Sequence, residues 1–191
     1  MPAEKKDIIL KAAVDIFARE GFYNTNTASI ADEAGVAVGT IYNYFDSKDA
    51  ILEEIFAREL EDRLQTLEEL SDRPDLAAME KLEEFLFHHF ARVKNNPSLG
   101  EVLVREREFP RKKSEAIRGY FYSVPQKLEE LLQEIEEDSR IEIEDPEISA
   151  AIIFGSIQGI MENALRKNNL DSLDGAHIAL ISMLKNGLRK Q

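Results

Sequence analysis

Apolar residues recur along this chain at the spacing of amphipathic α-helices. From position 8 to position 17 they return every three to four residues, and Gly21 follows where a left-handed helix end is expected. A polar turn ending in Thr27, the predicted N-cap, leads to a second helix over residues 28–34, which Gly35 closes. A tight turn and a third short helix follow.

The same periodicity continues in longer segments. Ser47 precedes the fourth helix and can cap it, and Pro125 lies inside a later helix, where a kink is expected because proline removes a backbone donor. No segment shows the alternation of a half-buried strand, so the sequence predicts an all-α protein of about nine helices. Beyond the first two, these helices are expected at residues 38–45, 48–70, 76–95, 99–108, 114–137, 146–167 and 174–189.

Composition places the chain among ordinary globular proteins. Its 191 residues are 43% hydrophobic and 32% charged, with no cysteine, nine glycines and six prolines, which argues against disulfide-stapled, collagen-like and disordered classes. The N-terminus shows no secretory signal, and the longest apolar-rich stretch, 148–161, is shorter than the roughly 20 residues of a membrane span. A cytoplasmic protein is therefore expected.

Segment 27–48 has the features of a helix-turn-helix. Two short helices joined by a turn containing Gly35 form a unit whose second helix fits a DNA major groove, roughly 12 Å wide. Ile30, Ile41 and Phe45 are predicted to pack into a core with the first helix. The opposite face of the third helix then presents hydroxyl and amide groups suited to phosphates and base edges: Thr40, Tyr42, Asn43 and Tyr44.

Residues 34–52, AGVAVGTIYNYFDSKDAIL, resemble the signature of the tetracycline-repressor (TetR) family of bacterial regulators. The match holds in order, spacing and position near the N-terminus, and it is far more specific than a bare helix-turn-helix pattern. The resemblance implies a repressor that binds operator double-stranded DNA as a homodimer. It also implies a DNA-binding domain at 1–48 and a helical effector-binding and dimerisation domain at 49–191.

By this resemblance, eight residues face DNA. Thr27 and Lys48 would meet phosphates at helix starts, and Asn43 is the best candidate for reading a base, because an amide can pair with adenine through two hydrogen bonds. Val38 departs from the family pattern, which commonly has Lys or Arg there. Alternatively, one of the two tyrosines belongs to the core. The predicted set is Thr27, Val38, Gly39, Thr40, Tyr42, Asn43, Tyr44 and Lys48.

Charge is distributed unevenly along the chain. The net charge is −13, of which residues 1–48 carry −2, with five cations against seven anions, and residues 49–191 carry −11. Affinity for DNA depends on cations that displace counterions from the phosphates. The sequence therefore predicts modest affinity with a shallow dependence on salt.

The last two predicted helices carry small and apolar residues suited to a dimer interface. In TetR-type proteins these helices pair with their symmetry mates into a four-helix bundle, and a dimer places two reading helices on half-sites roughly 34–36 Å apart. The alternative is that this surface is internal core of a monomer. The set is Ala150, Ala151, Gly155, Gly159, Ile178, Ile181, Met183, Leu184 and Leu188.

A cavity between the middle helices is where such proteins hold a small-molecule effector, and aromatic or flexible side chains are expected to converge there. Any one of them is more often plain core, and the alternative for His89 is a hydrogen-bonded, half-buried histidine. The predicted ligand-binding set is Phe85, His89, Phe90, Leu103, Arg105, Arg107, Phe121, Val124, Phe154, Gln158 and Met161.

Three stretches are similar to the fatty-acid-degradation repressors of Gram-positive bacteria, which respond to long-chain acyl-CoA: HHF at 88–90, LVREREFPRK at 103–112 and IFGSIQG at 153–159. An acyl-CoA effector would account for an apolar tunnel together with a basic group that meets the phosphates of CoA. The alternative is that these cations pair with neighbouring glutamates. The basic group is Arg105, Arg107, Arg111, Lys112 and Lys113.

Other classes of function find less support. The chain has no cysteine, no H-E-x-x-H motif and no glycine-rich phosphate loop, and the adjacent His88 and His89 point to different helix faces, so no enzyme, cofactor or metal site is predicted. A helical adaptor without DNA binding is disfavoured by the recognition signature. Among repressors, a drug-like cation or a planar aromatic compound is the alternative effector.

Overall fold

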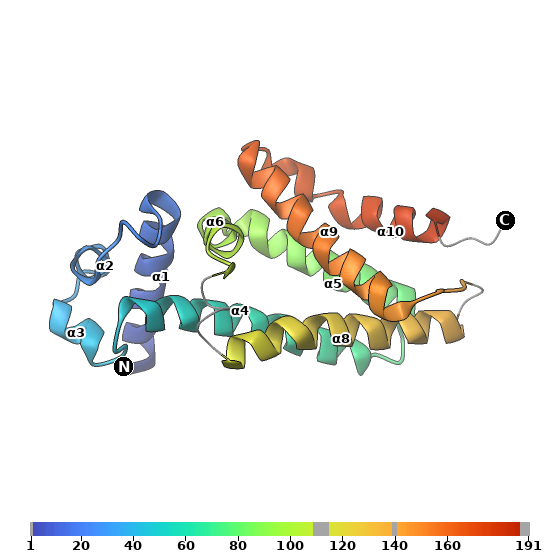
Figure 1. The fold of residues 1–191 in the computed structure, drawn as a ribbon, viewed down its shortest axis with the longest axis horizontal. Helices are drawn as coiled ribbons and strands as arrows, with labels where there is room; N and C mark the ends of the chain where they lie inside the picture. The colour runs from blue at the N-terminus through green and yellow to red at the C-terminus, as the bar shows by residue number, and fades with distance from the viewer. Residues whose placement is uncertain (1, 109–114, 139–140, 188–191) are drawn as a thin grey trace. The chain divides into compact units, whose positions relative to one another are not determined.

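A computed structural model describes residues 2–108, 115–138 and 141–187 (Figure 1). Within these ranges the chain forms nine α-helices, one 3-10 helix and no strand. The predicted all-α class and the number of helices are confirmed.

The chain divides into two compact units. One consists of Met1–Glu59 and Pro97–Arg118, and the other of Leu60–Asn96 and Gly119–Gln191. The helix-turn-helix segment lies wholly in the first unit, which also contains a helix from the middle of the sequence. Helix α4 (Lys48–Ser71) runs through the division, so a functional boundary after residue 48 stays a prediction.

The first unit is built around its N-terminal helix. Helix α1 (Pro2–Glu20) contacts both α2 (Thr27–Ala34) and α6 (Pro97–Arg105), and α2 contacts α3 (Val38–Tyr42). The apolar residues that recur every three to four positions form the core of this unit, as their spacing predicts. Its buried side chains include Ile9, Ile16, Phe17, Phe22, Ile30, Ile41, Phe45, Ile51 and Leu52.

The second unit is organised around α5 (Ala78–Asn95), which contacts α9 (Pro146–Arg166) and α10 (Ala176–Gly187). The loop between these last two helices contains a short 3-10 helix, Leu170–Leu173, which the sequence did not predict. Helix α8 (Glu115–Asp138) continues through Pro125.

Polar contacts tie these helices together. The buried ammonium of Lys81 on α5 lies 2.6 Å from the carboxylate of Glu134 on α8 and 3.2 Å from the carbonyl of Ser71 at the end of α4. On α5, Arg92 pairs with Asp62 of α4 at 2.8 Å. A buried cation is tolerated only when such partners replace its water.

The last two helices keep an apolar face in solvent. Exposed on them are Ile148 (58%), Ile152 (53%), Ile178 (58%) and Met183 (56%). Helix α9 has 21 residues, and an 18-residue window within it has a mean hydropathy of 1.3. By length and composition alone it could cross a membrane, and it is longer than the apolar-rich stretch 148–161. Of the residues predicted for a dimer surface, Ala151, Gly155 and Gly159 are also exposed, Leu188 lies outside the described residues, and Ala150, Ile181 and Leu184 are buried within the protomer instead.

Candidate nucleic-acid interface

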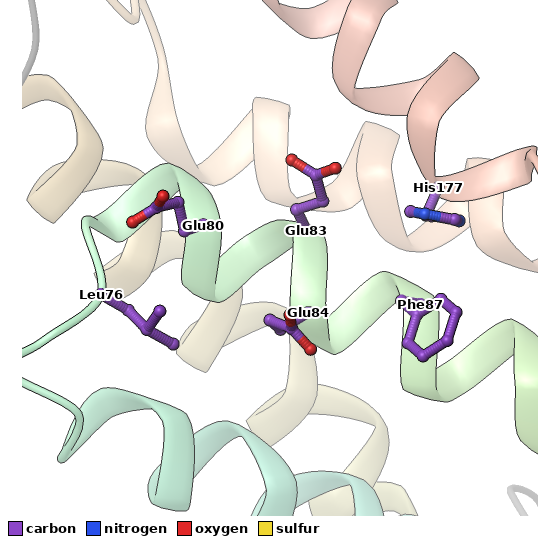
Figure 2. Close-up of a pocket in the computed structure, with 6 residues that line it drawn as sticks. All are labelled: Leu76, Glu80, Glu83, Glu84, Phe87 and His177. Carbon is purple, nitrogen blue, oxygen red and sulfur yellow. The ribbon is translucent and has the colours of Figure 1, made fainter.

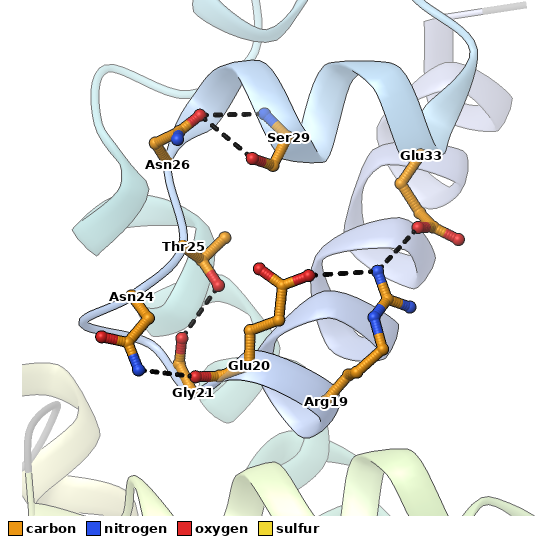
Figure 3. A network of polar contacts seen from close by, with 8 residues as sticks. All are labelled: Arg19, Glu20, Gly21, Asn24, Thr25, Asn26, Ser29 and Glu33. Carbon is orange, nitrogen blue, oxygen red and sulfur yellow. Dashed lines mark hydrogen bonds and ion pairs between the residues drawn. The ribbon is translucent and has the colours of Figure 1, made fainter.

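The turn into α2 is held by a side-chain cap. Asn26 is extended, with φ −124° and ψ 166°, and its Oδ1 accepts hydrogen bonds from the backbone N of Ser29 (2.9 Å) and from the Ser29 hydroxyl (3.2 Å), as Figure 3 shows. The prediction that Thr27 caps this helix is therefore wrong by one residue. Thr27 is the first residue of α2, so its hydroxyl is not used by the cap.

Gly35 closes α2, as predicted. Its φ of +65° is a left-handed conformation that glycine adopts without a steric penalty, and the N–H of Val36 returns to the carbonyl of Ala31 at 2.9 Å. Ile30 on α2 and Ile41 on α3 are both fully buried. The two helices are therefore fixed from behind by apolar packing, which leaves their other faces to solvent.

None of the eight residues predicted to contact DNA is buried. The hydroxyls of Thr27 and Tyr42 lie 3.1 Å apart, so a hydrogen bond joins the first residue of α2 to the last residue of α3. This hydrogen bond fixes the side chains of Thr27 and Tyr42 relative to each other in the absence of DNA. Their contact with DNA stays a prediction. Exposed are Val38, Gly39, Tyr42 and Asn43, and half-buried are Thr27, Thr40, Tyr44 and Lys48.

Lys48 has structural partners inside the protein. Its ammonium donates to the carbonyls of Phe22 and Thr25, each at 2.6 Å, and lies 4.3 Å from the centroid of the Phe22 ring. An ammonium carries three N–H groups, so the predicted phosphate contact would use the third. Lys48 thus positions the loop between α1 and α2 in addition to the role expected from the sequence.

Two cations of the first unit, Lys6 and Arg58, are paired with carboxylates. Glu54 on α4 lies 2.6 Å from Lys6 and 2.9 Å from Arg58, and Arg58 also contacts Asp7 on α1 at 2.6 Å. Partial burial raises the pKa of the Glu54 carboxyl, but the hydrogen bonds and charges of Lys6 and Arg58 outweigh that effect and hold the pKa below its ordinary value. These ion pairs join α1 to α4 within the first unit.

Arg19 near the end of α1 is paired in the same way. Its guanidinium lies 3.1 Å from Glu33 of α2 and 3.4 Å from Glu20 (Figure 3). A cation whose charge is already matched contributes less to the attraction of phosphates. This pairing agrees with the predicted shallow salt dependence, which stays a prediction.

The end of α6 contacts the end of α1. The Arg105 guanidinium donates to the carbonyls of Phe17 and, at 3.0 Å, Ala18 in the last turn of α1, and the Phe17 carbonyl also accepts from the backbone N of Gly21 at 2.9 Å. Glu106 is only 8% exposed, and its Oε1 accepts from the backbone N of Phe22 at 3.2 Å and from Arg105 Nε at 3.2 Å. The two side chains therefore close the start of the loop between α1 and α2.

The sequence analysis missed this contact. Arg105 donates to the end of α1, its predicted contact with CoA stays a prediction, and Glu106 was not singled out. Leu99, Val102 and Leu103, all buried, share a helix face with Glu106 because the four positions follow helical spacing. A carboxylate on an otherwise apolar face was the available signal of a buried, partnered charge.

The predicted ligand-binding residues are divided between the units. Leu103, Arg105 and Arg107 belong to the first unit, and the other eight belong to the second. Arg111, Lys112 and Lys113 lie outside the described residues. Within the second unit the structure buries Phe85, His89, Phe90, Val124 and Met161 and leaves Phe121, Phe154 and Gln158 half-buried.

Two contacts join members of this second-unit set. His89 Nε2 lies 3.2 Å from the sulfur of Met161, and the rings of Phe121 and Phe154 meet edge to face with centroids 6.5 Å apart. Burial, with smaller contributions from the charges of Arg63 and Arg92, lowers the pKa of the His89 imidazole well below its ordinary value. His89 is therefore neutral at pH 7, as an apolar site requires.

A separate pocket of about 390 Å³ lies in the second unit along α5 and the start of α10 (Figure 2). Its lining combines three carboxylates with an aromatic ring and an imidazole: Leu76, Glu80, Glu83, Glu84, Phe87 and His177. The rings of Phe87 and His177 meet edge to face with centroids 5.3 Å apart, and within the described part of the chain Nδ1 of His177 is buried without a hydrogen-bond partner. None of these residues was predicted as a ligand contact.

An N-terminal helix-turn-helix with an exposed, polar second helix defines a DNA-binding regulator. Residues 9–55 match the family model described as "Bacterial regulatory proteins, tetR family". The helix-turn-helix segment is therefore of the TetR type, and TetR proteins are a family of DNA-binding transcriptional regulators, not enzymes.

Similar proteins cover almost the whole chain. The fatty acid metabolism regulator protein of Bacillus subtilis is 26% identical over 188 residues, which is 96% of this chain and 95% of that protein. The fatty acid degradation regulator FadR from Bacillus halodurans superposes with a TM-score of 0.85 at 26% identity, covering 98% of this chain and 97% of the other. The regulator FadR from Bacillus subtilis, solved in complex with stearoyl-CoA, gives a TM-score of 0.82 at 25% identity, covering 95% and 98%.

Proposed function

We propose that this chain is a ligand-responsive, homodimeric repressor whose effector is a long-chain fatty acyl-CoA and which controls genes of fatty-acid metabolism in the cytoplasm. The observation that carries the proposal is the likeness, over nearly the full length, to a regulator solved with stearoyl-CoA. That likeness includes the second unit, whose apolar and aromatic side chains offer a surface for an acyl chain. The rings of Phe121 and Phe154, which meet edge to face, suit this role because an acyl chain needs only apolar contact.

The proposed dimer uses the exposed face of α9 and α10. Ile152 and Ile178 are each more than half exposed, a costly arrangement for large aliphatic side chains in water. Gly155 and Gly159 are also exposed on α9, and without side chains they allow a partner helix to approach closely. A second copy of the same surface would bury these residues around a two-fold axis, which an operator with two half-sites requires.

The proposed mechanism is a shift between two conformations. One conformation holds the two helix-turn-helix units at the spacing of the operator half-sites, and acyl-CoA binds the other conformation more tightly. The ligand then lowers operator affinity. The largest possible decrease equals the ratio of the ligand's affinities for the two conformations. Helix α4, which begins at Lys48 beside the helix-turn-helix and continues into the second unit, is the element expected to move.

The test is a titration of the protein against labelled duplex from upstream of its own reading frame, followed by fluorescence anisotropy at two salt concentrations with and without stearoyl-CoA. Saturable binding of two protomers per site that stearoyl-CoA weakens at least tenfold would support the proposal. Binding that stearoyl-CoA leaves unchanged would remove the lipid effector and keep the regulator. Free stearate and CoA, added separately, control for detergent-like and phosphate effects.

An organic cation is the second candidate effector, and the pocket in Figure 2 favours it. Glu83, Glu84 and Phe87 place carboxylates beside an aromatic ring that is 46% exposed, a combination that binds ammonium groups. A quaternary ammonium compound that weakens operator binding in the wild type but not in Glu83→Gln/Glu84→Gln would select this candidate. The same double variant should leave a response to stearoyl-CoA intact.

A further inference from the structure

Helix α6 belongs to one unit by packing and is joined to the other by the chain. Only Asn96 separates it from α5, the helix that carries Phe85 and His89 in the second unit. Yet α6 contacts α1 and falls into the first unit with the helix-turn-helix. A displacement of the end of α5 therefore reaches α6 directly through the backbone.

The end of α6 holds α1 through two adjacent side chains, Arg105, its last residue, and Glu106, the residue that follows. The Arg105 guanidinium supplies donors to carbonyls of the last turn of α1, and its positive charge lies at the negative end of that helix dipole. Glu106, buried, accepts the N–H of Phe22 across 84 residues of sequence. Removing that acceptor takes a hydrogen bond from the backbone of a residue that is only 2% exposed, and such a loss is costly in a folded protein.

The same residue, Phe22, is held from its other side. Its carbonyl accepts from Lys48 at 2.6 Å, and its side chain, 2% exposed, packs at 5.4 Å against the ring of Phe17. Four residues later, Asn26 caps α2. A shift of Phe22 would therefore shift the start of α2. Because a hydrogen bond joins Thr27 to Tyr42, the end of α3 would shift with it.

We propose that Arg105 and Glu106 form a clamp on the loop between α1 and α2, through which α6 sets the position of the helix-turn-helix and hence operator affinity. Both are positioning residues that act through the backbone of Phe22 and the end of α1. The proposal rests on the DNA-binding function of the family. It gives Arg105 a role other than contact with an effector.

The test compares Glu106→Ala, which removes the acceptor, with Glu106→Gln, which keeps an acceptor oxygen without the charge. Glu101→Gln, on the same helix, is the matched control. Two quantities are measured on the full-length protein: operator affinity by anisotropy, and hydrogen exchange of the Phe22 amide. We expect Glu106→Ala to raise the exchange rate of Phe22 at least tenfold and to weaken operator binding about tenfold, with Glu106→Gln restoring most of both.

Several outcomes would overturn the proposal. Phe22 exchange that is unchanged in Glu106→Ala would show that the carboxylate does not hold the loop. Faster exchange with unchanged operator affinity would show that the loop does not control the reading helices. If Glu106→Ala does not fold, Arg105→Gln replaces it. This variant keeps the acceptor of the Phe22 N–H, so it should weaken operator binding with a smaller rise in Phe22 exchange, and unchanged operator affinity would overturn the proposal.

The two measurements separate this proposal from the effector proposal. Neither uses acyl-CoA, so an absence of any response to stearoyl-CoA leaves the clamp unaffected. If no operator duplex binds even the wild type, the DNA-binding function itself fails, and the exchange measurement then decides on its own whether the clamp exists.

Discussion

The exposed face of α2 and α3 and the exposed face of α9 and α10 are built in opposite ways. The first displays hydroxyl and amide groups, such as Tyr42 and Asn43, on helices that a buried core fixes from behind. The second displays branched aliphatic groups, such as Ile152 and Ile178. Water solvates the first face well and the second poorly. The first is therefore suited to reversible contact with hydrated DNA, and the second to lasting association with another apolar surface.

The largest expected effect comes from placing charge on the apolar face. The double variant Ile152→Asp/Ile178→Asp should convert a dimer to a monomer, because carboxylates would have to be desolvated at the interface. Operator affinity should fall more than 100-fold, since one reading head binds a single half-site. Sedimentation and anisotropy measure the two effects. Gln126→Asp, which adds charge at an exposed position of α8, is the control. If the double variant remained dimeric, the apolar face of α9 and α10 would not be the dimer interface.

A smaller effect is expected on the polar face. Asn43→Ala should weaken binding to the operator by about 10- to 100-fold, the usual contribution of a two-bond base contact, without changing the melting temperature, because Asn43 is exposed. Binding to a scrambled duplex should hardly change. Asn95→Ala, at an exposed position of α5 in the second unit, is the control. Equal losses on both duplexes would identify Asn43 as a phosphate contact instead.

The apolar interior of the second unit should give the protein a pH dependence. Burial lowers the pKa of His89 well below 6.5, so the unfolded chain binds a proton at a pH where the folded protein does not. Stability that is fully present above pH 6.5 is therefore lost as the pH falls from there towards the folded pKa. Between pH 7 and pH 5 the wild type should therefore lose more of its free energy of unfolding than His89→Gln.

Urea unfolding at a series of pH values measures this difference. His88→Gln, at the exposed neighbouring position, is the control and should follow the wild type. Parallel curves for wild type and His89→Gln would mean that His89 is not held neutral in the folded protein.

The smallest expected effect is on the cap of α2. Asn26→Ala should lower the free energy of unfolding by about 1 kcal/mol, because the backbone N of Ser29 loses its acceptor. Asn26→Ser should retain most of that stability. Thermal unfolding measures the change, and an effect of Thr27→Ala larger than that of Asn26→Ala would restore Thr27 as the cap.

The two faces also differ in how well the sequence predicted them. The end of α2 was predicted because the backbone at Gly35 needs a left-handed conformation that favours one residue type. Its start was misplaced by one residue because Asn26 and Thr27 are both good caps, and only the backbone conformation decides between them. Local conformational preferences of this kind predict the ends of α2 from the sequence to within one residue.

The last two helices were located correctly, but their inner and outer faces were not separated. Helix α9 is apolar around most of its circumference, so periodicity cannot tell Ala150, which is buried, from Ala151, which is exposed. The role of Glu106 was missed for a different reason. Its partner, Phe22, lies 84 residues away, and no local pattern encodes a contact at that separation.

The hydrogen bond between Phe22 and Glu106 also orders events during synthesis. At about 5–20 residues per second, a ribosome that has completed residue 59 needs several more seconds to produce the end of α6. Until then the carbonyls of Phe17 and Ala18 lack the Arg105 donor, and the N–H of Phe22 lacks its acceptor. A nascent chain therefore lacks both contacts at the end of α1 until more than half of it has been translated.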